Sequence, residues 1–238
     1  MSKAVVVLDP GHGGYDPGAV AHGLKEKDLN LALGLAVAER LEEFKVLLTR
    51  DRDVFVSLAD RVALSRRAEA DLFLSLHANA GGGRGFESFA YSGLKPGHRA
   101  FVAQKSLHAE VIGVLKSWDI IDRGLKQAAF YVLKHNPAPA VLIESLFIDN
   151  EREAGIWQEK HFVQTLATGV IRGVRSALGL SPENGADAAP KPRPDKPEHK
   201  SLYTVQVGAF AYIDNARQRL AEAREAGFDD AYIYHKHF

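Results

Sequence analysis

The chain has 238 residues, of which 46% are hydrophobic, and its 30 basic side chains balance 30 acidic ones. This content suffices for one sizeable core with a small appendage, and the lack of a basic excess argues against a nucleic-acid partner. The sequence contains no cysteine, which excludes disulfides and thiolate metal sites. No apolar run approaches the roughly 20 residues of a membrane span, so we expect no membrane span. The opening "MSKAVVVLDPG" lacks a signal-peptide pattern, and we expect synthesis in the cytoplasm without a signal peptide.

Strand and helix patterns alternate through residues 1–180. In chain order we predict a strand at 4–8, a helix at 28–44, a strand at 45–49 and a helix at 57–68, which begins with a Ser57–Asp60 capping box. Strands at 72–76 and 86–91 follow, and then a helix at 98–118. The last two elements are a strand at 140–144 and a helix at 161–178, which ends at Gly179. Residues 125–133 are apolar and fit a helix or a strand equally well. The alternation predicts an α/β fold with a mostly parallel sheet and helices on both faces.

Two further segments follow this domain. Residues 181–201, "SPENGADAAPKPRPDKPEHKS", are rich in proline, alanine and charge, which predicts a semi-rigid linker. Residues 202–238 follow the pattern strand, helix, strand and predict a small β-α-β module. We therefore expect a larger domain at 1–180, a linker at 181–201 and a C-terminal module at 202–238.

The stretch "DPGHGG" at residues 9–14 follows the first predicted strand. Open α/β sheets bind ligands beyond the carboxyl ends of their strands. A nucleotide loop is disfavoured, because no Lys-Ser or Lys-Thr follows the glycines and their spacing does not form GxGxxG. His12 alone fits a turn residue at least as well as a ligand, so its interpretation depends on other residues.

Three more side chains occupy comparable positions. His77 follows the strand at 72–76, Glu144 closes the strand at 140–144, and Glu26 opens the helix after the glycine loop. Separately they fit an interior histidine, an ion-pairing or capping carboxylate and a helix-dipole partner. Together with His12 they supply two histidines, one carboxylate ligand and one spare carboxylate, which is the composition of a catalytic zinc site with an open position. Strand position alone leaves open which glutamate is the ligand.

Four stretches carry a family resemblance: "VVLDPGHGG", "GLKEKDLNLALG", "LLTRDRDVFVSLADRVALSRRAEADLFLSLHAN" and "PAVLIESLFIDNEREA". In this order, across residues 3–178, they resemble the zinc-dependent N-acetylmuramoyl-L-alanine amidases of the type-3 family. The resemblance implies a six-stranded α/β catalytic domain that hydrolyses the amide between N-acetylmuramic acid and L-alanine in bacterial peptidoglycan. It implies Zn²⁺ as the cofactor, bound by His12, Glu26 and His77. It also implies that Glu144 takes a proton from zinc-activated water and passes it to the leaving nitrogen.

Other residues near these motifs have less specific patterns. Asn79 and Arg50 are predicted substrate contacts, with a structural role as the alternative for each. Asp51 and Arg61 fit ion-pairing or capping roles. Residues 91–124 contain no long insertion beyond one predicted helix, so we expect an open cleft that no inhibitory helix covers.

The stretch "YTVQVGAFAYIDNARQRLAEAREAGF" resembles one repeat of the SPOR peptidoglycan-binding domain. That domain contains two such halves, and only one is present here, so either the sequence is cut short or two chains pair their halves. We expect a weak homodimer in which two chains pair through residues 202–238. Because this segment has no basic excess, we expect wall binding through hydrogen bonds and the aromatic rings of Tyr232 and Tyr234. A small adhesion module for another partner is the alternative.

These features together predict a cell-wall lytic enzyme, either a phage endolysin or an autolysin of a sporulating cell. Such an enzyme acts on the wall after holin-type release or lysis. Two alternatives remain: a zinc peptidase that cuts within the peptide stem, and a catalytically inactive wall-binding protein. The presence of all four residues of the predicted site argues against the second alternative.

Overall fold

The computed structural model describes residues 3–181 and 220–221. The chain divides into two compact units, Met1–Lys191 and Pro192–Phe238. Three predictions lie outside the described residues: the linker from residue 182 onward, the C-terminal module with Tyr232 and Tyr234 apart from residues 220–221, and the pairing of two such modules. Among the described helices, none combines the length and hydropathy that a membrane crossing requires.

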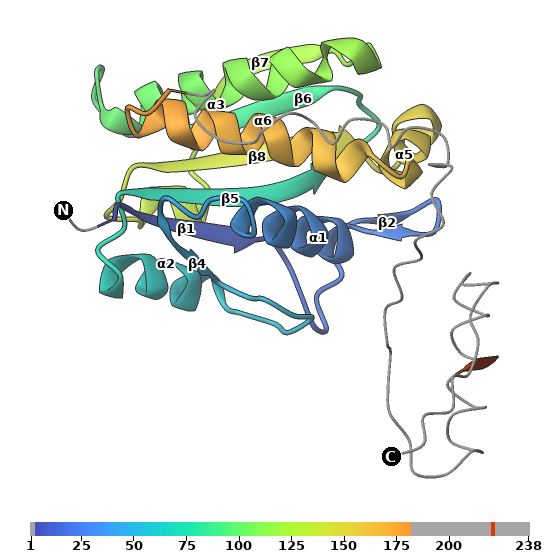
Figure 1. Cartoon of the computed structure of the whole chain (residues 1–238), viewed down its shortest axis with the longest axis horizontal. Helices are drawn as coiled ribbons and strands as arrows, with labels where there is room; N and C mark the ends of the chain where they lie inside the picture. Colours follow the sequence, from blue (N-terminus) through green and yellow to red (C-terminus); the bar gives the residue numbers. More distant parts are fainter. Residues whose placement is uncertain (1–2, 182–219, 222–238) are drawn as a thin grey trace, which may run out of the picture. The chain divides into compact units, whose positions relative to one another are not determined.

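The first unit is built on one mixed sheet (Figure 1). Its six strands lie in the order β4 (Lys45–Leu48), β1 (Val5–Pro10), β5 (Leu72–Asn79), β8 (Ala140–Phe147), β6 (Phe86–Tyr91) and β7 (Asp122–Ala128). β4, β1, β5 and β8 are parallel, whereas β6 pairs antiparallel with β8 and parallel with β7. The prediction of a mostly parallel six-stranded sheet is confirmed. One edge of this sheet therefore collects the carboxyl ends of β1, β5 and β8 and the amino ends of β6 and β7.

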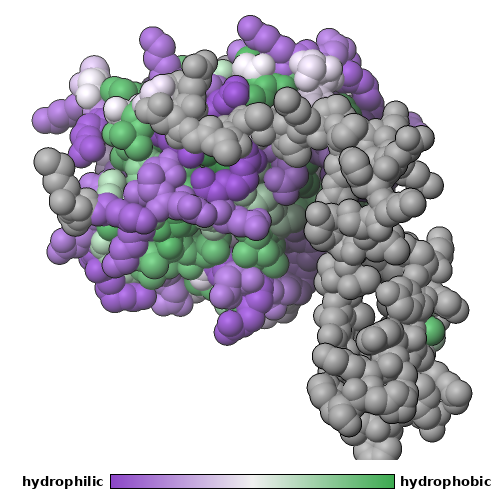
Figure 2. Space-filling model, in the orientation of Figure 1, coloured by the Kyte–Doolittle hydropathy of each residue, from purple (hydrophilic) through white to green (hydrophobic). Residues whose placement is uncertain are grey.

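Helices cover both faces of the sheet, as predicted. On one face α6 (Phe162–Ala177) packs against α1 (Glu26–Ala38) and α3 (Arg99–Leu115), and α1 and α6 lie in the foreground of Figure 1. On the other face α2 (Leu58–Arg67) packs against α4 (Tyr131–Lys134). The view in Figure 2 shows hydrophilic residues over much of the surface, with apolar residues between them.

Alternate residues of the central strands face the two helical layers. In β5, Leu72, Leu74 and Leu76 belong to the apolar cluster beneath α1, α3 and α6, whereas Phe73 belongs to the cluster beneath α2 and α4. Because both faces are covered, the strand is buried on both sides and its sequence is almost continuously apolar. The two clusters fix the register of the sheet and hence the order of side chains along its edge.

Several element boundaries differ from those predicted. The helix predicted at 28–44 begins at Glu26 and ends at Ala38. The apolar stripe misled the prediction, because Leu41 and Phe44 remain in the core although the chain has left the helix. The ambiguous stretch at 125–133 divides between β7 and α4.

Three short elements were not predicted: β2 (Val20–Ala21) and β3 (Leu24–Lys25), which form a hairpin, and α5 (Glu151–Gln158). Two of the predicted helix ends are confirmed. The hydroxyl of Ser57 accepts a hydrogen bond from the amide of Asp60 at 3.1 Å, which caps α2. Gly179, with φ of 80°, follows the end of α6.

Candidate metal centre

Three side chains meet at the edge of the sheet where β1 and β5 end. The Nε2 atom of His12 lies 3.1 Å from Oε1 of Glu26, and Nδ1 of His77 lies 2.8 Å from the same oxygen. One ligand atom from each residue lies within 4.8 Å of the other two. These separations approach the roughly 3.3 Å between ligand atoms in a tetrahedral zinc site with bonds of about 2.0 Å. Two imidazoles and a carboxylate are also a ligand set that zinc favours, so these residues fit the ion.

The three candidate ligands come from different elements. His12 belongs to the loop after β1, Glu26 is the first residue of α1, and His77 lies near the end of β5. Glycine is required where these segments approach one another. A Cβ atom on Gly11 would lie 2.1 Å from Cε1 of His77, and one on Gly18 would lie 2.6 Å from Oε2 of Glu26. The lack of a side chain at these two glycines therefore lets the backbone come close to His77 and Glu26.

Further hydrogen bonds orient the ligands. The Nδ1–H of His12 donates to Oδ2 of Asp16 at 2.9 Å, which leaves Nε2 directed at Glu26. The amide of Ala19 donates to Oε2 of Glu26 at 3.0 Å, and Nδ2 of Asn30 donates to Oε1 of Glu26 at 3.3 Å. A carboxylate on the second nitrogen of a metal-binding histidine fixes the tautomer and the ring orientation. Asp16 was not predicted as part of the site; its signal was its position four residues after His12.

The charges of this cluster reinforce one another. Burial alone would raise the pKa of Glu26, but hydrogen bonds and charge from His12 and His77 hold it well below its usual range. Burial lowers the pKa of His12, yet the hydrogen bonds and charges of Glu26 and Asp16 outweigh it and raise that pKa to about 9. Burial also lowers the pKa of His77, and its hydrogen bond with Glu26 raises it overall. The site thus attracts positive charge, which a divalent cation supplies in place of the two protons.

Glu144 lies beside this cluster. It pairs in register with His77 on the adjacent parallel strand, so the two side chains share one face of the sheet. Burial raises the pKa of Glu144 to about 7, and the negative charges of Glu26 and Glu87 add to this while His77 opposes it. A carboxyl group with a pKa near neutrality is suited to accept and return a proton.

Solvent reaches two of the candidate ligands. The side chains of His12 and His77 are 26% and 18% exposed. Both side chains are therefore partly open to solvent, and the open cleft expected from residues 91–124 remains a prediction.

Two arginines hold the glycine loop in place. Arg61 forms a buried ion pair with Asp9 at 2.7 Å and also donates to the carbonyl oxygen of His12 at 2.8 Å. Arg50 donates to the carbonyl oxygens of Pro10 at 2.9 Å and Gly11 at 2.8 Å, and only 3% of it is exposed. The ion-pairing role predicted for Arg61 is confirmed. The contacts of Arg50 favour the structural alternative over the predicted substrate contact.

The sequence did not predict a charged cluster on β6 and β7. Glu87 forms ion pairs with Arg123, at 2.7 Å, and with Lys126, and it accepts a hydrogen bond from Nδ2 of Asn79 at 2.9 Å. The available signal was the single carboxylate in the strand sequence "FESFAY". Asn79 therefore has a structural partner, and its predicted substrate contact remains a prediction.

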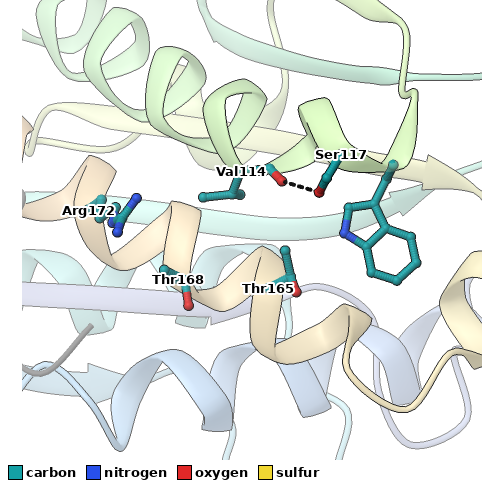
Figure 3. A pocket seen from close by; sticks show the side chains of 6 residues that line it. Val114, Ser117, Thr165, Thr168 and Arg172 are labelled. Carbon is teal, nitrogen blue, oxygen red and sulfur yellow. Dashed lines mark hydrogen bonds between the residues drawn. The ribbon is translucent and has the colours of Figure 1, made fainter. Parts of the chain in front are cut away.

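A cavity between α3 and α6 lies apart from the metal cluster. It has a volume of about 530 Å³, and Ser117 at its edge donates to the carbonyl oxygen of Val114 at 3.4 Å (Figure 3). None of the three side chains of the candidate metal cluster, His12, Glu26 and His77, lines this cavity. Its lining residues are Val114, Ser117, Trp118, Thr165, Thr168 and Arg172.

The sequence matches the models of two known protein families. The family model described as N-acetylmuramoyl-L-alanine amidase matches residues 6–176, and the SPOR domain model matches residues 199–237. The sporulation-specific N-acetylmuramoyl-L-alanine amidase of Bacillus subtilis is 39% identical over 228 residues, which cover 94% of this chain and 82% of that protein. The endolysin of Bacillus phage SPP1 is also 39% identical, over 99% of this chain and 89% of that protein.

The fold of a solved structure agrees as well. The crystal structure of N-acetylmuramoyl-L-alanine amidase from Clostridium difficile 630 aligns with a TM-score of 0.70 at 29% identity, over 75% of this chain and 98% of that one. The order of the motifs, the mostly parallel sheet and the matched range all lead to one assignment. This chain belongs to the N-acetylmuramoyl-L-alanine amidase family of type 3, and it carries a SPOR domain after its amidase domain.

Proposed function

We propose that the chain is a zinc-dependent N-acetylmuramoyl-L-alanine amidase that lyses bacterial cell wall, with His12, Glu26 and His77 as zinc ligands and Glu144 as general base and acid. The observation that carries this proposal is the convergence of one ligand atom from each of the three residues within 4.8 Å, with Glu144 in register beside His77. The family supplies the substrate class, which is the amide between N-acetylmuramic acid and L-alanine of peptidoglycan.

The side chains divide the work of this hydrolysis. A zinc ion held here supplies Lewis acidity that polarises the carbonyl group and acidifies water. Asp16 keeps Nδ1 of His12 protonated, so that Nε2 serves as the ligand atom. Glu144 accepts the proton of the attacking water and donates it to the nitrogen of L-alanine as the amide bond breaks. Its pKa of about 7 allows both transfers near neutral pH.

One digestion tests the reaction. Purified peptidoglycan incubated with the full chain is expected to release peptides with a free N-terminal L-alanine while the glycan strands remain intact. A chelator should stop the reaction, and added zinc should restore it. A zinc peptidase would instead release new N-termini within the stem. A Glu144→Ala variant that clears cell walls at the rate of the parent would contradict the assigned mechanism.

We also propose how the chain is organised around this activity. Residues 1–180 are the catalytic domain, residues 181–201 are a linker, and residues 202–238 bind the wall, with Tyr232 and Tyr234 as predicted contacts. The SPOR match at residues 199–237 supports the last part. A weak homodimer through residues 202–238 remains a prediction, and light scattering at increasing concentration tests it. A chain truncated after residue 180 should cleave soluble muramyl peptides normally but sediment less with insoluble wall.

The relatives suggest the biological setting. A phage endolysin and a sporulation-specific amidase match this chain at the same 39% identity. Both support a role in cell-wall lysis, and we propose that the enzyme reaches the wall after holin-type release or lysis. Expression in the cytoplasm of a host cell should be harmless until a holin is supplied, and cell turbidity should then fall.

A further inference from the structure

The charged cluster on β6 and β7 lies beside the proposed catalytic residues, and its carboxylate, Glu87, is in line with them. Glu87 pairs in register with Glu144, which pairs in register with His77. The three side chains therefore form a row on one face of β5, β8 and β6. Adjacent strands lie about 4.8 Å apart, so β7, with Arg123 and Lys126, lies about 10 Å beyond Glu144. The glycine loop with His12 lies on the opposite side of Glu144, because β1 lies beyond β5.

This cluster keeps a positive charge. Two cations, Arg123 and Lys126, share one buried carboxylate, that of Glu87, so one formal positive charge remains. The side chains of Arg123 and Lys126 are 32% and 37% exposed, whereas that of Glu87 is 8% exposed. The cations therefore face solvent while the carboxylate lies beneath them.

The two cations are also held in place. The guanidinium of Arg123 lies 4.9 Å from the centre of the Phe147 ring, and Nζ of Lys126 lies 5.9 Å from that of Phe89. Both contacts fall within the range of cation–π interactions. Such restraint lowers the entropy that these long side chains lose when they bind a ligand. The cluster thus presents a partly ordered cationic surface beside the proposed general base.

We propose that Arg123 and Lys126 bind a carboxylate of the peptide stem, on the leaving-group side of the scissile amide. This inference rests on the proposed function. The lactyl carboxyl group of muramic acid is consumed in the amide, so the free carboxylates of the substrate lie in its peptide half. The stem therefore extends over β8, β6 and β7, and the sugar lies toward the loop of His12. Arg123 and Lys126 act here as substrate-positioning residues.

Muramyl peptides with defined carboxylates test this subsite in the full chain. One substrate keeps all of its stem carboxylates, and in each of the others a single carboxylate is converted to the amide, which identifies the carboxylate that binds. Lys126→Met removes the positive charge and keeps an unbranched apolar side chain at this position, while Arg123 still neutralises Glu87. We expect Lys126→Met to raise KM about tenfold for the fully charged substrate. The variant should leave KM nearly unchanged for the substrate that lacks the bound carboxylate.

Two variants serve as controls. Lys45→Met makes the same change in net charge at the first residue of β4, on the opposite edge of the sheet, and should leave KM unchanged for every substrate. Lys126→Arg should keep the preference of the parent, because it keeps the charge. A thermal unfolding scan identifies any variant whose folding has changed.

Binding of the free stem peptide gives a readout that does not depend on turnover. By calorimetry, Lys126→Met should weaken the affinity for this peptide about tenfold. An equal effect on charged and amidated ligands, or no effect at all, would overturn the subsite. If the parent chain binds the stem peptide through Lys126 but cleaves no muramyl peptide, the proposed function fails and the subsite stands.

Discussion

The Nδ1–H group of His12 donates to Oδ2 of Asp16 across 2.9 Å, four residues along the same loop. Because this bond fixes the tautomer of His12, we expect Asp16→Ala to weaken zinc affinity by about 10- to 100-fold. Competition with a chromophoric chelator measures this affinity directly. Asp51→Ala is the matched control, since Asp51 is 66% exposed and lies 3.5 Å from Arg52. Zinc binding by Asp16→Ala at the affinity of the parent would remove Asp16 from the metal centre.

The contact between Gly11 and the ring of His77 gives a steric prediction. A Cβ atom at position 11 would lie 2.1 Å from Cε1 of His77, closer than any van der Waals contact allows. Gly11→Ala should therefore displace the ring, abolish stoichiometric zinc binding and abolish activity. Gly113→Ala in α3 should leave both unchanged, because no heavy atom lies within 4 Å of its new Cβ. Metal content after gel filtration distinguishes the two variants.

Glu144→Gln separates catalysis from metal binding. The amide cannot accept the proton of water, so we expect the turnover rate to fall by about 10²–10⁴-fold while zinc content stays the same.

The same substitution should stabilise the metal-free fold at pH 8. The pKa of Glu144 is raised from 4.5 to about 7 in the fold, so its favourable contribution is present below pH 4.5 and is lost as the pH rises through 7. Removing the buried charge should add about 1–3 kcal/mol to the free energy of unfolding at pH 8, measured by urea titration.

The pH–rate profile reports the same carboxyl group. A general base acts in its deprotonated form, so kcat/KM should fall about tenfold per pH unit on the acidic side of its pKa. That pKa is about 7 in the metal-free structure, and the positive charge of bound zinc lowers it, so the limb should lie at or below pH 7. The residual activity of Glu144→Gln should lack this limb. An identical acidic limb in that variant would assign the titration to another group.

The buried pair of Arg61 and Asp9 gives a stability prediction. Nη1 of Arg61 lies 2.7 Å from Oδ1 of Asp9, and the side chains of Arg61 and Asp9 are 3% and 1% exposed. Arg61→Met leaves a buried carboxylate without its cation, which should cost about 3–5 kcal/mol of unfolding free energy. Arg52→Met should change stability by less than about 0.5 kcal/mol, because the Arg52 side chain is 76% exposed. Chemical denaturation at saturating zinc compares the variants.

Strand ends explain how much of the site could be predicted from the sequence. His12, His77 and Glu144 follow apolar stretches that form adjacent parallel strands, so their convergence follows from the α/β pattern. Glu26 opens a helix, and its choice as ligand over Glu144 came from the family resemblance, because strand position does not distinguish them. The structure brings Oε1 of Glu26 within 3.1 Å of both histidine rings.

The charged residues near the candidate site were not predicted because two strands of the sheet run opposite to the other four. Glu87 and Arg123 are the second residues of β6 and β7, which begin at the edge of the sheet where β1, β5 and β8 end. The direction of a strand within a sheet depends on distant parts of the chain and is not visible in a local sequence pattern. Because the prediction considered only residues that follow strands, it did not include Glu87 and Arg123, which lie where strands begin. The early end of α1 has a similar cause, since Leu41 and Phe44 continue the apolar stripe without continuing the helix.

The reversed direction of β6 also determines which surface turns lie far from the candidate metal centre and therefore suit the attachment of a label. Residues 92–98, which join β6 to α3, leave the sheet at the edge opposite the metal centre. The six residues of β6 span about 20 Å at strand geometry, and this length separates the turn from the catalytic edge. A fluorophore, affinity tag or immobilising anchor placed in this turn should leave the approach of polymeric substrate unobstructed. The same attachment between β5 and β6 would lie at the edge of the candidate metal centre and should obstruct that approach.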